Sequence, residues 1–370
     1  MYLNKLSLVN FKNVPCVSQE FARGINCLVG DNGAGKTNVL DSVYYLSMCK
    51  SAFSMTDRQC VRHGEEFFML EGEYLSDSGR RTSVVCSFSG KSGKTVKCAD
   101  KQYERISDHV GLVPVVVVSP ADAFLVSDAA EERRRYINSA ISQLDRDYLH
   151  TVMRYNAVLA ERNRLLKQIP SAGQSEILEV LDMQLVSHGN KIYRRRQEYI
   201  ELLRPLVEEF YRVLSDEREH VELVYDSELA KGDFAALLAS SMQKDFINQF
   251  TGVGIHRDDM LMRIGGRPLK KYGSQGQQKS FLVALKLAQY AIVAKEKGEH
   301  PILLLDDLFD KLDAGRVERL IGLVVGDGFG QIFISDCNRE RIERILLGCA
   351  AEYSLFAVGN GGVEKIERRI

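Results

Sequence analysis

The sequence predicts an α/β fold that is interrupted by a long helical insertion. Short apolar runs typical of buried strands lie near both ends of the chain, at residues 25–29 and 302–305. Between them, from about residue 128 to residue 214, apolar residues recur three or four positions apart, as they do in paired helices. A glycine-rich segment directly after the first apolar run defines the kind of α/β fold.

That segment is a phosphate-binding loop of the pattern G-x-x-x-x-G-K-[ST], and it consists of Gly30-Asp31-Asn32-Gly33-Ala34-Gly35-Lys36-Thr37. Glycines let backbone N–H groups approach a phosphate, while Lys36 can reach the β and γ oxygens and the Thr37 hydroxyl can ligate Mg²⁺. Residues 38–48 continue as a predicted helix whose N-terminus faces the anion. We therefore expect the loop to bind ATP and Mg²⁺, with Lys36 also catalytic; an ordinary glycine-rich turn is the alternative.

The first 125 residues favour strands and turns around this one helix. Alternating apolar residues predict a strand that begins near Leu3 and two antiparallel strands at 67–75 and 82–88, joined by a turn at 77–79. The β-branched run 115–118 is typical of a buried strand. This part of the sequence therefore predicts much of a sheet-rich head.

The helical insertion consists of two apolar series with near-heptad spacing. One runs from Ile141 to Arg162, the other continues to Val213, and Pro170-Ser171-Ala172-Gly173 separates them. This pattern predicts an antiparallel coiled-coil arm, and Pro205 should kink or split its second helix. An ordinary helical hairpin packed on the core is the alternative.

The α/β pattern returns after about residue 250. The apolar strand 302–305 ends in Asp306 and Asp307, and in phosphate-loop folds a carboxylate at this position holds Mg²⁺. Asp306 fits that metal role, and Asp307 could polarise the attacking water as a catalytic base. The predicted domains are an N-terminal part of the head, the inserted arm and a C-terminal part of the head, at residues 1–127, 128–250 and 251–370.

A polar segment before that strand, Ser274-Gln275-Gly276-Gln277-Gln278-Lys279-Ser280, opens another predicted helix. Its position is similar to the signature segment of ABC-type ATPases, where the serine and the glycine amide contact the γ-phosphate held by a second subunit. This similarity implies that Ser274, Gly276 and Gln277 contact ATP across an ATP-dependent homodimer. Serine is also a favoured helix cap, which is the alternative. Lys311-Leu312-Asp313 resembles the D-loop of the same ATPases, so four features occur in the expected order.

Composition and charge exclude several classes of function. The 49 Lys and Arg are balanced by 50 Asp and Glu, so any surface that attracts nucleic acid must be local. No apolar run is long enough to span a bilayer and the N-terminus lacks the apolar core of a signal peptide, so we expect a cytoplasmic protein without a membrane partner. The 8 cysteines form no C-x-x-C pair, which favours free thiols over a zinc site.

Segments spread over the chain resemble the RecF family of bacterial recombination-repair ATPases. They are the opening strand at 8–13, the segments 117–122 and 132–137, the arm segment 155–167, and the two most diagnostic pieces, His256-Arg257-Asp258-Asp259 and Ser274-Gln275-Gly276-Gln277-Gln278. The resemblance extends from near residue 1 to about residue 345. It implies an ABC-type ATPase head with an arm that binds DNA, either single-stranded or at a gapped or duplex junction, when ATP is bound.

The same resemblance implies a slow hydrolysis switch, face-to-face dimerisation, and action with RecR and RecO in recombinase loading at single-strand gaps, replication restart and the SOS response. Two departures from ABC transporters matter. Asp307 stands where they usually have Glu, which suits a slow switch. Ile334-Ser335-Asp336-Cys337 stands where they carry a histidine. Asp336 could lie near the γ-phosphate or be a polar strand end.

The candidate DNA contacts are clustered arginines, because phosphate binding needs cations gathered on one surface. They are Arg133, Arg134, Arg135, Arg162, Arg164, Arg194, Arg195 and Arg196, with Arg58 and Arg62 as a further pair. Few aromatic residues lie among them, so contacts to the backbone are favoured over base stacking. Acidic residues are interspersed, and a solvated helix face is the alternative for each cluster. His256 and Arg257 could serve the nucleotide, although a structural role is favoured.

Three functions compete on this sequence. The first is a DNA-binding ATPase switch. The second is the ATP-hydrolysing subunit of a transporter or of another SMC-like or ABC assembly, and the missing histidine and the helical insertion disfavour the transporter. The third is a P-loop kinase for a small molecule, which the helix that begins near Ser274 and the arm disfavour.

Overall fold

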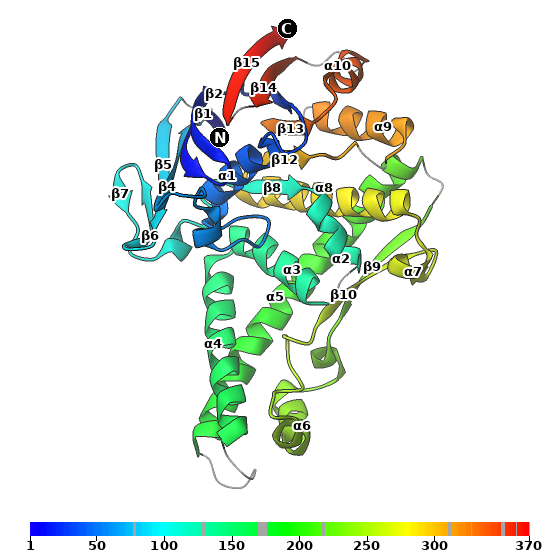
Figure 1. Cartoon of the computed structure of the whole chain (residues 1–370). Coiled ribbons are helices and arrows are strands. Elements are labelled where there is room, and N and C mark those ends of the chain that lie inside the picture. The colour runs from blue at the N-terminus through cyan, green and yellow to red at the C-terminus, as the bar shows by residue number, and fades with distance from the viewer. Residues whose placement is uncertain are drawn as a thin grey trace. The chain divides into compact units, whose positions relative to one another are not determined.

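Apolar strands from both ends of the chain join in one sheet, as the computed structural model shows (Figure 1). The structure describes residues 1–76, 79–127, 130–168, 176–216, 219–309, 312–326, 328–348, 352–359 and 361–369. Two compact units are present, and the first comprises residues 1–123, 209–218 and 274–370, while the second comprises residues 124–208 and 219–273. These limits differ from the predicted boundaries near 128 and 251, because residues 251–273 belong to the second unit.

The first sheet of the head unit is parallel except at one edge. Its strands, in spatial order, are β15 (Gly362–Arg369), β14 (Tyr353–Gly359), β3 (Ile25–Val29), β13 (Ile332–Asp336), β12 (Ile302–Asp306) and β8 (Val115–Val118). Only β15 runs antiparallel to its neighbour. Every residue of β3, β12 and β13 is buried, which explains why these strands are continuous apolar runs rather than alternating ones.

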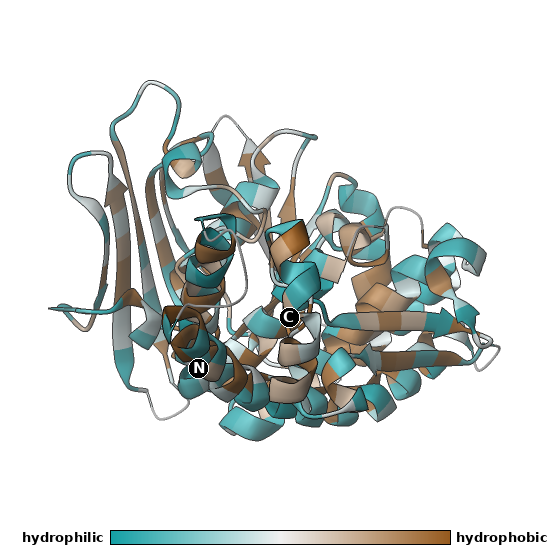
Figure 2. Ribbon diagram, turned by 90° about the horizontal axis from the view of Figure 1, so that it is seen from below, coloured by the Kyte–Doolittle hydropathy of each residue, from teal (hydrophilic) through white to brown (hydrophobic). Residues whose placement is uncertain are grey.

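The second sheet of the head unit is antiparallel. Its order is β2 (Val14–Glu20), β1 (Tyr2–Phe11), β4 (Phe67–Leu75), β5 (Arg81–Ser89), β6 (Gly93–Cys98) and β7 (Lys101–Gln102). Buried and partly exposed residues alternate along β4, and brown and paler or teal bands alternate along the strands at the left of Figure 2. The predicted strands are confirmed, while Asp77 and Ser78 of the predicted turn lie outside the described residues.

Helix α1 (Lys36–Met48) packs against strands of both sheets. Buried side chains occur on all of its sides, including Leu40 and Tyr45, because a helix between two sheets has no solvent face. The core that surrounds it combines residues of both sheets, such as Leu8 and Leu304. The first turn of α1 is thereby fixed at the carboxyl edge of the parallel sheet.

Three further helices complete the head unit. They are α8 (Gln275–Lys297), α9 (Ala314–Val325) and α10 (Arg339–Gly348). Helix α8 contacts β8 at the edge of the parallel sheet and ends at Gly298, whose φ of 66° lies in the left-handed region that glycine favours. The helix predicted to open near Ser274 and the strand predicted at 302–305 are confirmed.

The second unit contains the helical arm. Its helices are α2 (Ala123–Ser127), α3 (Ala130–Leu144), α4 (Arg146–Gln168), α5 (Glu176–Ser215), α6 (Phe234–Asn248) and α7 (Leu269–Tyr272), and the last residues of α5 belong to the head unit. A small antiparallel sheet of β11 (Arg267–Pro268), β10 (Asp259–Ile264) and β9 (Val221–Asp226), which the sequence analysis missed, packs with them.

Helices α4 and α5 lie side by side in opposite directions (Figure 1), with Arg162 bonded to Asp182 and Tyr148 bonded to Arg196. The first apolar series is divided between α3 and α4, because Asp145 accepts a hydrogen bond from the Tyr148 amide and caps α4. The predicted connection at 170–173 lies outside the described residues.

The predicted second half of the arm needs two corrections. Pro205 does not split α5, which continues as one helix to Ser215. The expected seam residues Leu202 and Val213 are exposed, whereas the neighbouring Leu203 and Leu214 are buried. None of the described helices combines the length and apolar character needed to cross a bilayer.

Candidate nucleotide-binding site

The phosphate-binding loop leaves the sheet at its centre. Strand β3 lies between β14 and β13, and the loop that follows it leads directly into α1. Gly33 and Gly35 have φ angles of 83° and 110°, which non-glycine residues rarely adopt, so these glycines permit the tight turn. Gly30 has a different reason to be glycine, since a Cβ there would lie 2.2 Å from the carbonyl oxygen of Val358.

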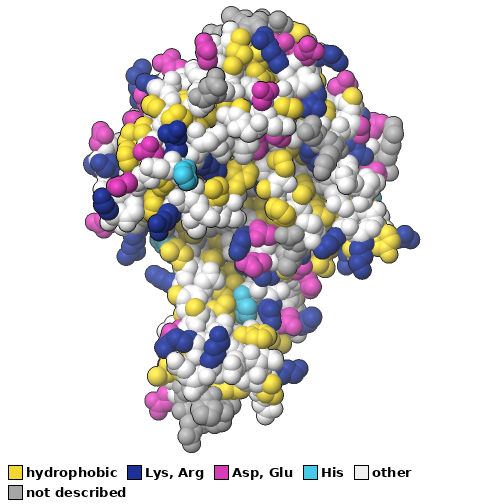
Figure 3. Space-filling model, viewed as in Figure 1, with side chains coloured by type: hydrophobic (Ala, Val, Ile, Leu, Met, Phe, Trp, Pro, Cys, Tyr) yellow, Lys and Arg dark blue, Asp and Glu magenta, His cyan; other side chains and the backbone are white. Residues whose placement is uncertain are grey.

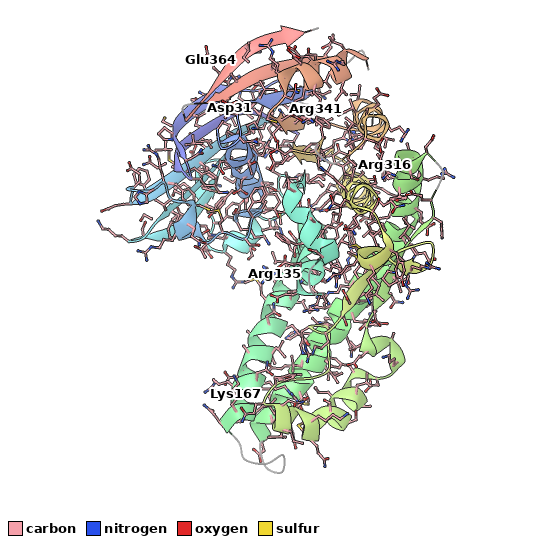
Figure 4. All side chains as sticks on the ribbon, turned by 45° about the vertical axis from the view of Figure 1, so that its right-hand side comes forward. Asp31, Arg135, Lys167, Arg316, Arg341 and Glu364 are labelled. Atoms are coloured by element: carbon pink, nitrogen blue, oxygen red, sulfur yellow. The ribbon has the colours of Figure 1, made fainter. Side chains whose placement is uncertain are left out.

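The Lys36 side chain is nearly buried and folds back over the loop. Its ammonium donates to the carbonyl oxygens of Gly30 at 2.7 Å and Asp31 at 3.0 Å. Figure 4 labels Asp31, which belongs to the same loop. Because α1 has no acidic residue in its first turn, the positive end of the helix and the lysine both favour an anion at this place.

Thr37 and Asp306 meet although they are 269 positions apart in the sequence. The Thr37 hydroxyl donates to the carboxylate, with both carboxylate oxygens at 3.0 Å. Ser335, the partner of Asp306 in the β12–β13 ladder, donates its own hydroxyl to the same carboxylate at 2.6 Å. The sheet order therefore brings together the two predicted metal ligands, Thr37 and Asp306.

Asp306 is nearly buried, and burial raises the pKa of its carboxyl group above the ordinary range. The hydrogen bonds from Ser335 and Thr37 oppose that rise, while the neighbouring Asp307 adds to it. A cation would compensate the buried charge. Hard oxygen donors suit Mg²⁺, which usually takes one or two protein ligands and completes its shell with phosphate and water.

Asp307 follows at the strand end in a left-handed backbone conformation, with φ of 44°. Its amide donates to the Ser335 hydroxyl at 3.1 Å, so one serine supports both carboxylate residues. Positive φ is uncommon outside glycine and is found most often in Asn and Asp. The strand end is therefore shaped by Ser335, which the sequence analysis named only as part of a departure from transporters.

Asp336 is a polar strand end that is tied to a helix. Its buried carboxylate accepts hydrogen bonds from Arg341 Nη2 at 2.7 and 2.6 Å and from the Asn338 amide at 2.6 Å. Arg341, labelled in Figure 4, also lies over the ring of Phe309 at 5.8 Å. This arrangement fits the structural alternative for Asp336.

Ser274 caps α8, as the alternative interpretation expected. Its hydroxyl oxygen accepts from the Gln277 amide at 3.2 Å, and the Gln277 side chain accepts from the Ser274 amide at 2.7 Å. Ser274 and Gln275 are nevertheless exposed, and Gly276 is half-buried. Capping and contact with a second subunit are therefore compatible.

The segment that resembles a D-loop is also a helix cap. Asp313 accepts from the Arg316 amide at 2.9 Å at the start of α9, and Arg316 donates to the hydroxyl of Ser280 in α8 at 2.8 Å. Figure 4 labels Arg316 on its helix. Lys311 lies outside the described residues.

Sequence reasoning missed the contribution of the β1–β2 turn. Asn13 donates to the carbonyl oxygen of Gly33 at 3.2 Å and accepts from the Asn38 amide group at 2.7 Å. Its neighbour Lys12 forms a buried ion pair at 2.6 Å with Asp41 of α1. Asp41, the one charged residue in the predicted helix 38–48, was the available signal for this support.

Comparison with known proteins fits this arrangement. The family model described as RecF/RecN/SMC N terminal domain matches residues 2–345. The DNA replication and repair protein RecF of Phocaeicola vulgatus is 43% identical over 364 residues, covering 98% of each chain, and that of Bacteroides fragilis is 42% identical over 369 residues, covering 100% of each. This chain belongs to the RecF family.

Solved structures give the same answer. The recombination mediator protein RecF with ATP, from the RecFOR pathway, superimposes with a TM-score of 0.88 at 28% identity and covers 99% of this chain and 98% of that one. The Smc head domain of Pyrococcus furiosus with an extended coiled coil has a TM-score of 0.59 at 15% identity, covers 99% of this chain and 96% of that one, and so shows the fold alone. The predicted family and fold class, an ABC-type head with an inserted antiparallel helical arm, are confirmed.

Within this RecF-family arm, Arg162 is a structural residue. It has no exposed surface, and its guanidinium donates to Asp182 at 2.6 Å, to Asp245 at 2.8 Å and to the Thr251 hydroxyl at 2.9 Å. The prediction that Arg162 contacts DNA is therefore wrong, because its charge is already satisfied between α4, α5 and α6.

Arg196 is buried in the same way. It donates to Asp258 at 2.8 Å, to the carbonyl oxygen of Ile255 at 2.7 Å and to Asn138 at 3.0 Å, and only 1% of its surface is exposed. The neighbouring Arg195, also a predicted DNA contact, is half-buried and pairs with Asp145.

Most of the remaining predicted DNA contacts are bonded to other groups of the protein. Arg133 forms two hydrogen bonds with Asp259, and Arg134 donates to the carbonyl oxygen of Asp258. On the exposed helix faces Arg135, labelled in Figure 4, pairs with Glu131 and Glu132, and Arg164 pairs with Glu161. Arg194 is exposed. No common basic surface on the arm follows from these positions.

The segment His256-Arg257-Asp258-Asp259 organises the second unit. His256 Nδ1 accepts from the Tyr155 hydroxyl at 2.8 Å, and Nε2 donates to the carbonyl oxygen of Thr251 at 2.9 Å. Burial lowers the pKa of His256 to about 4, so the ring is neutral near pH 7. With Asp258 and Asp259 paired to arginines, the favoured structural role is supported.

Proposed function

We propose that this RecF-family protein is an ATP-dependent DNA-binding protein of recombinational repair. ATP closes two protomers face to face, and slow hydrolysis opens them again. The observation that carries the proposal is the contact between Thr37 and Asp306, which joins the phosphate-binding loop to the carboxylate strand at one sheet edge. Named relatives act in DNA replication and repair, and one solved relative is a complex with ATP.

Each residue of the loop has its own contact with the nucleotide. The amides of residues 30–37 surround the phosphates, and Lys36 exchanges its two carbonyl bonds for the β and γ oxygens. Thr37 and Asp306 would hold Mg²⁺ through their side-chain oxygens, and the cation would supply positive charge beside the phosphates. Asp307 lies next along the chain and orients the attacking water, and its short side chain suits a slow switch.

Dimerisation rests on Ser274. Its hydroxyl oxygen is used by the Gln277 amide, but the serine is exposed, and its hydroxyl hydrogen can be donated to a γ-phosphate held by a second protomer. The free amides at the start of α8, including that of Gly276, add a positive helix end. Gln277 contributes to the same contact through its place in the cap.

The proposed DNA and protein partners rest on membership of the RecF family. The relatives are named for DNA replication and repair, and the solved RecF structures come from the RecFOR pathway. We accordingly place this protein with RecR and RecO in recombinase loading at single-strand gaps, with roles in replication restart and the SOS response. Single-stranded or gapped DNA is the expected substrate. A small-molecule kinase or a transporter subunit has no support from the family.

Light scattering with and without ATP and Mg²⁺ tests the switch. We expect a monomer without nucleotide and a dimer with ATP, together with tighter binding of gapped DNA in a gel-shift series. Ser274→Arg should bind ATP but remain a monomer, because the larger, charged side chain blocks the closure of the two protomers. Glu296→Arg, an exposed change in the last turn of the same helix, should dimerise normally. A monomer in every condition with unchanged DNA affinity would refute the proposal.

A further inference from the structure

Arg162 and Arg196 of the arm are buried, but the segment that runs from the second unit into the head contains another group of cations. Residues 260–295 contain no Asp or Glu, whereas they contain Arg263, Arg267, Lys270, Lys271, Lys279, Lys286 and Lys295. In a chain whose 49 basic and 50 acidic residues are otherwise intermixed, this stretch is locally positive. Two of these cations have acidic partners, since Lys286 pairs with Asp122 and Arg263 pairs with Glu222.

Three of the remaining cations lie close together in the sequence, one in β11 and two in α7. Arg267, Lys270 and Lys271 are all exposed, and among the described residues no acidic side chain pairs with them. Lys270 donates to the backbone carbonyl of Ser127, which leaves its charge uncompensated. Figure 3 shows Lys and Arg side chains gathered at the right-hand edge, where Figure 1 places α7.

This basic hairpin is presented on a fixed support. Strand β10 pairs with β9 along six residues, and Gly265 and Gly266 turn the chain with φ angles of 54° and 74°. Leu269, the first residue of α7, has no exposed surface, so the start of this helix is packed inside the protein. Because the backbone is already ordered, binding a ligand has to restrict only the side chains of these cations.

Tyr272 adds an aromatic ring to the group. It is 58% exposed, and the Arg267 guanidinium lies 5.2 Å from the centre of its ring. That stacking orients the guanidinium without neutralising it, so its N–H groups remain directed to an external anion. Exposed Arg and Lys beside an exposed ring fit a repeating phosphate chain better than a single small anion, which needs an enclosed pocket.

We propose that Arg267, Lys270, Lys271 and Tyr272 form a contact surface for the sugar-phosphate backbone of DNA. The inference rests on the proposed function and specifies where the DNA is held. Only Gly273 separates Tyr272 from Ser274, the cap of α8. DNA on this surface therefore restrains the segment that leads into the proposed dimer contact.

The test compares two double variants of equal charge change. Arg267→Ser with Lys271→Ser removes two unneutralised cations, while Arg135→Ser with Arg164→Ser removes two that are paired with glutamates. Binding of the full-length protein to a fluorescent gapped duplex is followed by anisotropy with ATP over a salt series. Thermal unfolding checks that both variants fold.

We expect the hairpin variant to lose roughly tenfold or more in affinity, and the slope of log affinity against log salt to fall by about two, since each phosphate contact contributes about 0.9. The paired-arginine variant should resemble the unchanged protein. ATP-driven dimerisation without DNA should persist in both.

Equal affinity and salt slope in the hairpin variant and the unchanged protein would overturn this inference alone. If the unchanged protein binds no DNA while dimerising normally, both the inference and the DNA part of the proposed function fail. Absence of ATP-driven dimerisation, by contrast, counts against the switch and not against the surface.

Discussion

The Thr37 hydroxyl lies 3.0 Å from both carboxylate oxygens of Asp306. The residues between Thr37 and Asp306 form most of both units. The two side chains nevertheless meet, because β3 and β12 belong to the same parallel sheet. The bond joins the start of α1 to the end of β12. Ser335, on the strand between β3 and β12, donates a second hydrogen bond to the same carboxylate. The site is therefore a property of the sheet order and not of any local segment.

Lys36→Ala should weaken ATP binding by about 1.5–3 kcal/mol, the usual value of a charged hydrogen bond. The fold should persist, because the two carbonyl oxygens that Lys36 contacts belong to a loop open to water on one side. Titration with a fluorescent ATP analogue measures the loss, and circular dichroism checks the fold. Unchanged affinity would remove the lysine from the site.

Asp306→Asn should abolish the effect of Mg²⁺ on ATP binding while leaving weak binding of ATP without metal. The amide keeps the shape and one acceptor for Thr37 and Ser335 but lacks the charge that attracts the cation. ATP titrations with Mg²⁺ and with EDTA measure this difference. A Mg²⁺ dependence equal to that of the unchanged protein would show that the metal is held elsewhere.

Gly30→Ala should destabilise the head by about 1–3 kcal/mol and lower ATP affinity, because the new methyl group meets the Val358 carbonyl at 2.2 Å and pushes the loop from β14. Gly24→Ala is the matched control, since nothing lies within 4 Å of its added Cβ. Urea unfolding of both variants gives the comparison. Equal midpoints would contradict the close packing of the loop.

Arg162→Leu should cost about 3–5 kcal/mol of stability, because it leaves the carboxylates of Asp182 and Asp245 without their cation. Arg164→Leu, two positions along the same helix, should change stability little, since its glutamate pair is exposed. Urea denaturation resolves effects of this size. Similar unfolding curves for the two variants would indicate that Arg162 is not buried.

The His256 imidazole should stay neutral down to about pH 4 in the folded protein. Its pKa is lowered on folding, so the unfolded chain takes up the proton more readily, and stability falls as the pH drops from about 6.5 toward 4. Imidazole NMR titration, assigned with His256→Gln, measures the pKa directly. An ordinary pKa near 6.5 would contradict the buried contacts with Tyr155 and Thr251.

Much of the head could be predicted because its signals are local. Strand 115–118 is continuous and apolar, strand 67–75 alternates, and the loop before Lys36 has a fixed pattern of glycines. The coming together of Thr37 and Asp306 followed from known sheet order. Each of these features needs only a short window of sequence or a motif in a known order.

The arm was predicted less well because its buried positions depend on partners distant in sequence. Arg162 and Arg196 look like surface cations until Asp245 and Asp258 are placed beside them. The seam after residue 200 was assigned one position out of register, since Leu203 and Leu214 are buried instead of Leu202 and Val213. Strands 221–226 and 259–264 bury alternate residues over part of their length, but their sequences, VELVYD and DMLMRI, do not alternate regularly between apolar and polar residues.

The position of β3 also bears on how the protein is made. Both of its neighbours in the sheet, β13 and β14, come from the last forty residues of the chain. During synthesis the strand that leads into the nucleotide loop therefore remains without either neighbour until residues 332–336 and 353–359 have been made. Folding of the head must be late and dominated by long-range pairing, which makes it slow and dependent on protection of β3 from aggregation. A chain that ends between residues 38 and 331 would contain the complete loop and yet lack both strands that pair with β3.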